Sequence, residues 1–338
     1  MPNQHNFPEC FACPACGAEV EVDPASFTCA ECARVYPVIA GIPDFRLRSD
    51  PYLGLEQERE KALRLSEKSA SGFSAMLDYY YQITDDVTAS LAIRYKAYHH
   101  NSINQARYGL EALSLSSDDR LLDAGCGTGG ALIAASDITS NIVGVDIALR
   151  WLVMCKQRLL EHGVQATLVC ADVEALPFHK RGFTRILASD LLESVYSVDD
   201  TLGSLRDQLV NEGTMWISAN NQYCIGPHPS TRMWAIGYLP ARSRGFLLRI
   251  LRGVDSSRLI NLVSPRDLVR RAKKQGLIPL RLSPKMIQQN NIKDYPVFDR
   301  FLIDLYVKCN RIGFFRKILL LVGPAFELLL CRTRKNHH

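Results

Sequence analysis

The sequence predicts an α/β protein built on a doubly wound, mostly parallel sheet. Three apolar runs that each end in a carboxylate support this prediction: NIVGVD up to Asp146, LVCAD up to Asp172 and ILASD up to Asp190. Short, continuous apolar runs are typical of strands that are buried on both faces. Since parallel strands end at the same edge of a sheet, we expect the chemistry of the protein at that edge.

The segment LLDAGCGTGG, Leu121 to Gly130, is the most informative of the chain. An apolar strand runs into a loop with glycines at positions 125, 127, 129 and 130, and the segment Ala131–Ser136 continues as a helix. Glycine lets the backbone turn sharply and approach a ligand, and the start of the helix offers free N–H groups. Asp146, at the tip of the next strand, is placed to hold the two hydroxyls of a ribose.

The composition of this loop excludes several ligands. Its spacing, G-C-G-T-G, lacks the third glycine of the dinucleotide fingerprint, and no GK[ST] sequence follows, so nucleoside triphosphates are disfavoured. Asp123, Asp146, Asp172 and Asp190 are expected to form an acidic rim where the strands end. Such a rim suits a cationic, ribose-bearing ligand better than a pyrophosphate.

The order of these motifs resembles that of one enzyme family. The segments DAGCGTG, GVD, CADVEALPF and LASDLLESV, between Leu121 and Asn221, are similar to the motif series of class I S-adenosylmethionine-dependent methyltransferases. The branch of the ubiquinone-biosynthesis O-methyltransferases is the most similar. The resemblance implies a seven-stranded Rossmann-like sheet and S-adenosylmethionine as the methyl donor. The alternative is a doubly wound fold in which the carboxylates only cap helices.

The resemblance also implies where the donor binds. The first motif would shape the methionine pocket, the acid after the second strand would hold the ribose, the third motif would flank the adenine, and the fourth would close the methionine end. In this sequence the implied residues are Asp123, Gly125, Gly127, Gly129, Asp146, Ile147, Asp172, Val173, Ser189 and Asp190. Glu193 is followed by Ser194 where the ubiquinone branch has a histidine, so no catalytic residue is assigned.

Four cysteines near the N-terminus predict a zinc site. Cys13-Pro-Ala-Cys16 and Cys29-Ala-Glu-Cys32 supply the four thiolates of a closed, structural site, and Cys10 is left over. With YPVIAGIPDF after them, they resemble the zinc ribbon typified by the activator subunit of eukaryotic tRNA and release-factor methyltransferases. The ribbon either folds a small module or recruits an acceptor such as RNA. Its acidic composition favours the structural role.

Composition and apolar pattern indicate an enzyme that stays inside the cell. The first thirty residues contain no apolar core of a signal peptide, and the apolar stretch Ile318–Leu330 is interrupted by Gly323, Pro324 and Glu327. We therefore expect a cytoplasmic protein without a transmembrane segment. In a reducing compartment, the eleven cysteines indicate metal binding rather than disulfides.

We expect three parts: a zinc-ribbon module (1–48), a linker with a helical lid (49–115), and the methyltransferase domain (116–338) with acceptor-side insertions at about 221–262 and 291–322. Helical spacing marks the segments Phe73–Gln82 and Ser90–Leu113. The tyrosines at 79–81 and the pair His99–His100 are pocket candidates within them. Packed aromatics with ordinary surface histidines are the preferred interpretation.

The last third of the chain is expected to form the acceptor side. Residues 232–338 hold 22 lysines and arginines against 6 acidic residues, which favours an anionic partner: a phosphorylated or carboxylated substrate, a membrane surface or nucleic acid. The cluster at 270–274 is interpreted as a solvated helix face, whereas the arginines at 242, 244, 249 and 252 lie in the insertion next to the expected pocket. Tyr223, Trp234 and Tyr238 are candidates for lining that pocket. His228 is a candidate general base, although a structural role is preferred for this lone histidine.

The C-terminal elements follow from periodicity. Ser264–Pro284 is expected to form a helix, a glycine stop and a strand, and Ala325–Arg332 the last strand. Tyr295 to Val322 shows an amphipathic helical pattern in which Phe298, Phe301 and Leu305 share one side. We expect this helix to pack over the acceptor pocket, with contact to a membrane surface as the alternative.

The function expected from these features is methyl transfer from S-adenosylmethionine to an acceptor that is a small molecule, a sugar or a lipid-linked compound such as a glycolipid. An anionic group on this acceptor would suit the basic last third of the chain. Methylation of oxygen is favoured. The absence of an Asn-Pro-Pro-Tyr sequence after the fourth strand argues against amino-methylation of adenine or glutamine. The alternatives are an rRNA or tRNA base methyltransferase that uses the ribbon to bind RNA, and a non-enzymatic scaffold. The sequence fixes neither the acceptor nor the oligomeric state.

Overall fold

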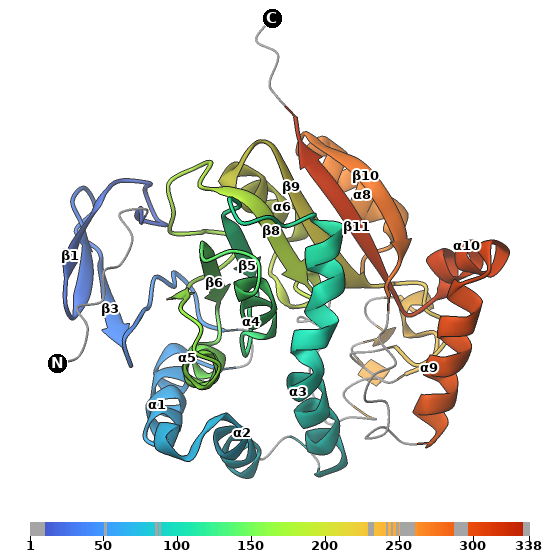
Figure 1. Ribbon diagram of the computed structural model, residues 1–338, viewed down its shortest axis with the longest axis horizontal. Coiled ribbons are helices and arrows are strands. Elements are labelled where there is room, and N and C mark those ends of the chain that lie inside the picture. The colour runs from blue at the N-terminus through green and yellow to red at the C-terminus, as the bar shows by residue number, and fades with distance from the viewer. Residues whose placement is uncertain are drawn as a thin grey trace, which may run out of the picture.

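A seven-stranded sheet forms the centre of the molecule, with the strand order β10-β11-β9-β8-β5-β6-β7 (Figure 1). In chain order the strands are β5 (Leu121–Ala124), β6 (Ile142–Asp146), β7 (Thr167–Cys170), β8 (Phe183–Ser189), β9 (Leu209–Asn220), β10 (Leu277–Pro284) and β11 (Ala325–Arg332). The neighbours from β7 to β9 pair in parallel, and β11 runs antiparallel to both β9 and β10. The predicted mostly parallel, Rossmann-like sheet is confirmed.

This computed structural model describes residues 11–50, 53–84, 87, 89–228, 233–240, 243–244, 246–247, 250, 261–286 and 297–333. Cys10 and the arginines at 242, 249 and 252 lie outside the described residues. Among the described residues, no helix combines the length and apolarity that crossing a bilayer requires.

Helices cover the sheet in two layers. One face carries α1 (Leu55–Ser66), α2 (Phe73–Gln82), α3 (Ala89–Ala112), α4 (Gly130–Ser136) and α5 (Leu149–Glu161). The other face carries α6 (Val198–Gln208) and α8 (Pro265–Lys274), and their buried Leu202, Leu205 and Leu268 join its core. Alternating residues of a strand serve the two cores, because side chains alternate across the pleat: Leu121 belongs to one and Leu122 to the other.

The helices before the first central strand are part of this body. A Cβ on Gly109 of α3 would lie 2.6 Å from Leu187 and 3.1 Å from Trp216, so α3 sits directly on the sheet. A Cβ on Gly130 would lie 2.2 Å from the hydroxyl of Ser102, so α3 also touches the start of α4. Tyr80 is buried, in agreement with the preferred interpretation of the tyrosines as packed aromatics. The lid function of residues 49–115 stays a prediction.

The N-terminal module is a small antiparallel sheet of β1 (Val20–Asp23), β2 (Ser26–Cys29), β3 (Val35–Ile39) and β4 (Ile42–Pro43). It docks on the free edge of the large sheet, where Asp44 pairs in parallel with Cys170 and the amide of Phe45 donates to the Cys170 carbonyl at 2.8 Å. Its Phe11 ring stacks on Phe178 of the main domain with ring centroids 5.7 Å apart. The module therefore shares a hydrophobic core with the large sheet.

The C-terminal amphipathic segment differs from its prediction in two ways. It forms two helices, α9 (Val297–Asn310) and α10 (Gly313–Val322), rather than one. Its apolar side also faces outward: Phe298 and Phe301 are 57% and 61% exposed, whereas Asp299 is buried. The reason is tertiary, because Asp299 pairs with Arg94 of α3 and the Tyr306 hydroxyl donates to the Lys285 carbonyl, which fixes the polar side of α9 inward.

Candidate functional site

The glycine loop lies between β5 and α4 and is tied to the end of β6. The amides of Gly125 and Cys126 both donate to the Val145 carbonyl, at 2.8 and 3.0 Å. Gly125, Gly127 and Gly129 all have positive φ angles (78°, 50° and 77°), which explains why glycine stands at each position. A Cβ on Gly127 would meet no atom within 4 Å, so this side of the loop is open to a ligand.

Two carboxylates flank this loop. Asp146 accepts hydrogen bonds from the amides of Gly127 and Ala148, at 2.9 and 2.8 Å, and burial raises its pKa to about 6 against these two bonds. Asp123 is 3% exposed, and burial together with the charge of Asp146 raises its pKa to about 7. Near neutral pH the protonated and ionised forms of these two carboxyl groups are therefore close in free energy. A bound cation would favour the ionised forms.

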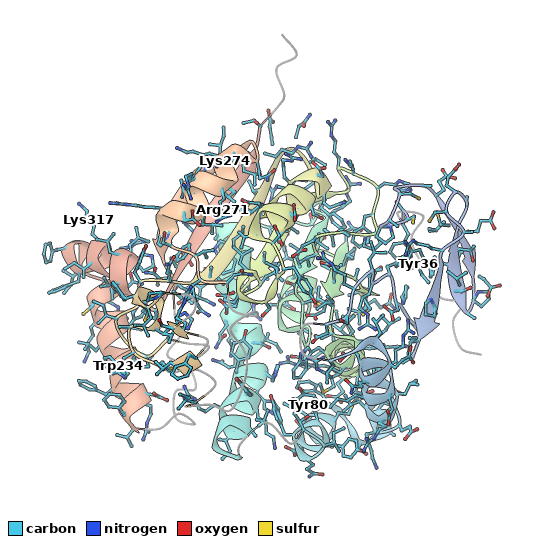
Figure 2. All side chains as sticks on the ribbon, turned by 180° about the vertical axis from the view of Figure 1, so that it is seen from behind. Tyr36, Tyr80, Trp234, Arg271, Lys274 and Lys317 are labelled. Carbon is cyan, nitrogen blue, oxygen red and sulfur yellow. The ribbon has the colours of Figure 1, made fainter. Side chains whose placement is uncertain are left out.

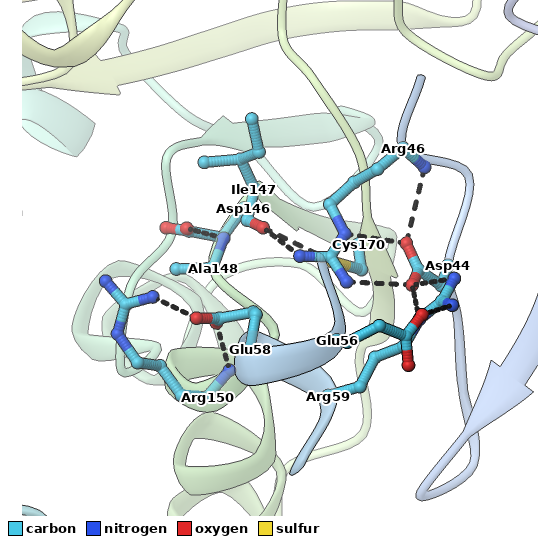
Figure 3. Close-up of polar contacts among 10 residues, drawn as sticks. All are labelled: Asp44, Arg46, Glu56, Glu58, Arg59, Asp146, Ile147, Ala148, Arg150 and Cys170. Atoms are coloured by element: carbon cyan, nitrogen blue, oxygen red, sulfur yellow. Dashed lines mark hydrogen bonds and ion pairs between the residues drawn. The ribbon is translucent and has the colours of Figure 1, made fainter. Parts of the chain in front are cut away.

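A buried ion-pair network joins the N-terminal module to the segment that follows Asp146 (Figure 3). The Arg46 guanidinium donates to both oxygens of Asp44, at 2.7 and 2.8 Å, and to the backbone carbonyl of Ile147 at 3.2 Å. Arg59 of α1 donates to the same Asp44 at 3.3 Å. Burial works against the ionised Asp44, but its two arginine partners hold its pKa below the ordinary range.

The same segment is held a second time from α1. Glu58, which is 0% exposed, accepts from the Arg150 amide at 2.9 Å and forms an ion pair with the Arg150 guanidinium. Asp50 reaches the same guanidinium at 3.3 Å. The loop between β6 and α5 is thus clamped by residues that precede the first central strand.

The third strand tip is neutralised by the chain itself. Asp172 accepts from Arg48 Nε at 2.8 Å, and the same guanidinium reaches Glu174 at 2.5 Å and lies over the Tyr196 ring, 4.7 Å from its centroid. The neighbouring Val173 is buried. Arg48 lies at the end of the N-terminal module, so this module reaches two of the expected donor-binding positions, Ile147 through Arg46 and Asp172 through Arg48.

The fourth strand tip is paired as well. Asp190, in a left-handed backbone conformation (φ 52°), receives Lys285 Nζ at 2.7 Å on one oxygen and 2.5 Å on the other. The Ser218 hydroxyl also donates to Asp190, at 2.9 Å, and lies 3.3 Å from the hydroxyl of Ser189. The expected rim therefore offers two carboxylates without a cationic partner in the described part of the chain, Asp123 and Asp146, rather than four. Arg48 and Lys285 were missed because no local pattern marks them as partners.

Glu193 lies beside this tip and is the most unusual acid of the site. One of its oxygens accepts from the Asn220 amide at 2.5 Å, and the other has no hydrogen-bond partner among the described residues. Burial and the nearby Asp190 raise its pKa to about 7, with Lys285 acting in the opposite direction. A buried, half-satisfied carboxyl near neutrality has the properties of a general base.

A second group of side chains surrounds the glycine loop from the α3 side. His99 is half-buried, its Nδ1 lies 3.2 Å from the Thr128 hydroxyl, and its ring lies 4.8 Å from that of Trp151. Burial and the nearby Arg158 lower its pKa to about 3. His99 is therefore not the ordinary surface residue expected from sequence, whereas His100 is exposed.

The acceptor-side candidates differ in how far they are buried. His228 is fully buried, its two ring nitrogens have no partner among the described residues, and burial lowers its pKa to about 4. Tyr238 donates to the Tyr223 carbonyl at 3.0 Å, and both rings are partly exposed. Trp234 is 59% exposed. Of the four arginines singled out, only Arg244 is described.

The four predicted cysteines come together in the N-terminal module. All four sulfur atoms lie within 4.8 Å of one another, with 3.7 Å from Cys13 to Cys32 and 3.5 Å from Cys16 to Cys29. These separations suit a tetrahedral shell of thiolates about 2.3 Å from a zinc ion. The Tyr36 hydroxyl lies 3.1 Å from the Cys13 sulfur and orients it. The four-cysteine cluster is consistent with structural zinc.

One family model matches part of the chain. Residues 121–213 match a family model described as a methyltransferase domain. No curated protein matches the chain. Structures of similar fold include the cyclase SpnF, at 15% identity and a TM-score of 0.46 over 68% of this chain and 80% of that one.

Two further structures of similar fold are those of methyltransferases. Phosphoethanolamine N-methyltransferase 2 of Haemonchus contortus has 16% identity and a TM-score of 0.47, and the match covers 71% of this chain and 57% of that one. Geranyl diphosphate C-methyltransferase of Streptomyces coelicolor A3(2) has 17% identity and a TM-score of 0.47, over 68% and 77%. The match of the family model spans the glycine loop, Asp146, Asp172 and Glu193. The chain contains a class I S-adenosylmethionine-dependent methyltransferase domain.

Proposed function

We propose that this enzyme methylates a small-molecule, sugar or lipid-linked acceptor, with oxygen as the favoured atom. The observation that carries the proposal is the pair of unneutralised carboxylates, Asp123 and Asp146, beside the open Gly127. S-adenosylmethionine supplies an activated methyl group on a sulfonium, so the protein has to align the acceptor, exclude water and accept a proton.

The donor-binding residues belong to the proposal. Asp146 holds the ribose with Ile147 beside it, Val173 and Asp172 flank the adenine, and Asp123 with Gly125, Gly127 and Gly129 forms the methionine pocket. Ser189 and Asp190 close its far end. Arg46 and Arg48 then act as positioning residues, since each is bonded to a segment that carries one of these contacts.

Glu193 is the proposed proton acceptor. With its pKa raised to about 7, Glu193 is a stronger base than an ordinary carboxylate and is still ionised at slightly alkaline pH. Its second oxygen has no partner among the described residues. A hydroxyl acceptor needs such a group, because transfer of the methyl group leaves its proton to be removed. His228 is a weaker candidate, since burial lowers its pKa to about 4 and so reduces its basicity.

A role of the ribbon in RNA recognition is less well supported. Its residues 11–48 contain three arginines, Arg34, Arg46 and Arg48, and the latter two are engaged by Asp44, Asp172 and Glu174. RNA binding draws on cations that are free to contact phosphates. The shared core instead favours a ribbon that stabilises the catalytic domain.

The proposal is tested by calorimetric titration with S-adenosylmethionine. Asp146→Ala should weaken donor binding by roughly 10- to 100-fold, since hydrogen bonds to a charged group contribute about 1.5–3 kcal/mol. Asp137→Ala, at an exposed carboxylate after α4, is the matched control and should bind normally. Absence of binding by the native protein, or an equal effect of the two variants, would exclude the assigned donor site.

A screen of metabolite pools with labelled donor identifies the acceptor. With that acceptor, Glu193→Gln should bind the donor but lose methyl transfer.

A further inference from the structure

The α9–α10 hairpin, residues 297–322, carries the largest group of exposed apolar side chains among the described residues. Phe314 is 70% exposed, Phe301 61% and Leu321 54%. The full set is Val297, Phe298, Phe301, Leu305, Ile312, Phe314, Phe315, Ile318 and Leu321. No residue of α10 is buried, although seven of its ten residues are large and apolar. A surface of this kind on a folded chain indicates an interaction site.

The hairpin is firmly attached on its other side. Asp299 pairs with Arg94 of α3 at 3.2 Å, and the Tyr306 hydroxyl donates to the Lys285 carbonyl at 2.6 Å. The side chain of Asn221 donates to the Leu321 carbonyl at 3.0 Å, and the Ile225 amide donates to the Val322 carbonyl. These polar contacts hold one side of the hairpin against the rest of the protein. They therefore fix the opposite side, which carries the phenylalanines, toward solvent.

Basic side chains are interleaved with these apolar ones. Arg300, Arg311, Arg316 and Lys317 are exposed, and no ion pair involving them occurs among the described residues. The two acids of the hairpin are already engaged, Asp299 by Arg94 and Asp304 by Lys308. Lys317 lies at the outer edge of the molecule, on α10 (Figure 2). The surface is therefore both apolar and positively charged.

We propose that the α9–α10 hairpin docks on the surface of an anionic phospholipid bilayer. Phenylalanine and aliphatic side chains would enter the interfacial region while the arginines and Lys317 contact lipid phosphates, which is the pattern of a membrane-surface helix. A second copy of the chain fits less well. A two-fold contact would bring the same positively charged surface of two copies together, and like charges across an interface are unfavourable.

The position of the hairpin makes docking relevant to the acceptor. The Lys285 carbonyl that anchors α9 belongs to the residue whose side chain pairs with Asp190, so the docked surface and the end of β8 are joined through one residue. In Figure 1 the hairpin lies at the opposite end of the molecule from the N-terminal module. Docking would therefore leave the ribbon and the donor-side network away from the lipid.

Co-sedimentation of the full chain with vesicles tests the proposal without any acceptor. We expect binding to vesicles containing phosphatidylglycerol and little binding to pure phosphatidylcholine. Arg311→Glu with Lys317→Glu should weaken binding by at least about thirtyfold, because each basic residue lost near an anionic surface contributes about a factor of five and each glutamate gained is repelled. Phe314→Ser with Phe315→Ser should weaken binding by at least about tenfold, also at high salt.

Two matched controls separate docking through the hairpin from non-specific hydrophobic or electrostatic binding to vesicles. Leu160→Ser removes an apolar side chain that is 72% exposed on α5, and Lys273→Glu with Lys274→Glu reverses the basic cluster at the end of α8. Both should bind vesicles like the native chain. The proposal is overturned if the native chain does not bind, if the controls lose binding equally, or if sedimentation shows a dimer that the phenylalanine variant disrupts. Normal donor binding by every variant shows that each one is folded.

Discussion

The guanidinium of Arg46 donates a hydrogen bond to the backbone carbonyl of Ile147, across 101 positions of sequence. Arg46 lies near the end of the N-terminal module, and Ile147 follows Asp146, the carboxylate that we propose holds the ribose. The side chain of Arg46 is 0% exposed, and Asp44 holds it through two further bonds. The stability of the ribbon and the shape of the proposed donor site are thereby connected through one buried side chain.

Arg46→Leu should lower both stability and donor affinity. The substitution leaves Asp44 buried with only Arg59, and removing one member of a buried pair costs roughly 3–5 kcal/mol of unfolding free energy. Urea denaturation measures the first effect and calorimetry with S-adenosylmethionine the second. Arg270→Ala, which breaks an exposed pair with Asp267, should change neither measurement by more than about 0.5 kcal/mol. A destabilised variant with normal affinity would show that the bond does not shape the site.

Zinc removal should destabilise the catalytic domain as well as the ribbon. Cys13, Cys29, Phe27 and Phe178 share one core, so loss of the thiolate cluster should loosen packing against the sheet. We expect about one zinc per chain by atomic spectroscopy, and a lower Tm after chelation or in Cys16→Ser. Cys309→Ser, at a partly exposed cysteine of α9, is the control and should retain both zinc and Tm. An unchanged Tm in metal-free protein would contradict the coupling.

Donor affinity should rise with pH between about 6 and 7 and then level off. The pKa of Asp123 is raised to about 7 in the free protein, and a bound cation favours its ionised form, so binding below that pH releases a proton. Calorimetry in buffers of different ionisation heat measures this release directly. Asp123→Asn should bind more weakly and release fewer protons, with only the contribution of Asp146, whose pKa is raised to about 6, remaining. Equal proton release in native protein and variant would assign the effect to another group.

Glu193→Gln should stabilise the protein at alkaline pH. The folded-state pKa of Glu193 is raised to about 7, so between about 4.5 and 7 the folded state holds a proton that the unfolded state has released, and stability falls as pH rises through that range. Glutamine never ionises, so the variant should gain roughly 1–3 kcal/mol at pH 8 and almost nothing at pH 5. Denaturation at both pH values measures the difference. The same gain at both would contradict a buried, titrating carboxyl.

Gly130→Ala should destabilise the fold at the contact between α3 and α4. The new Cβ would lie 2.2 Å from the Ser102 hydroxyl and 2.8 Å from its backbone carbonyl carbon, so α3 would have to move. The expected cost is roughly 1–3 kcal/mol. Gly313→Ala, at the start of α10 with no atom near the added methyl group, should be neutral or slightly stabilising. Comparison of the two unfolding free energies separates the contact from helix propensity.

Local patterns explain why much of the fold was predictable. The end of β11 at Arg332 and the helix–glycine–strand order of 264–284 follow from apolar periodicity and turn residues, which act over a few neighbours. The cysteine spacing likewise identified a ligand set that the structure brings together. The Asp123–Gly129 loop and Asp146 meet because adjacent parallel strands end at one edge, which strand order alone requires.

The sequence by itself thus determined the sheet, the glycine loop, the thiolate cluster and S-adenosylmethionine as the methyl donor. Only the tertiary structure decided which carboxylates remain unneutralised, since Arg48 and Lys285 reach Asp172 and Asp190 from distant segments. It also decided that Arg46 supports Ile147 and that the apolar side of α9 faces outward. The physical reason is common to these cases: spacing fixes local conformation, whereas the partner of a buried charge is selected by how whole elements pack.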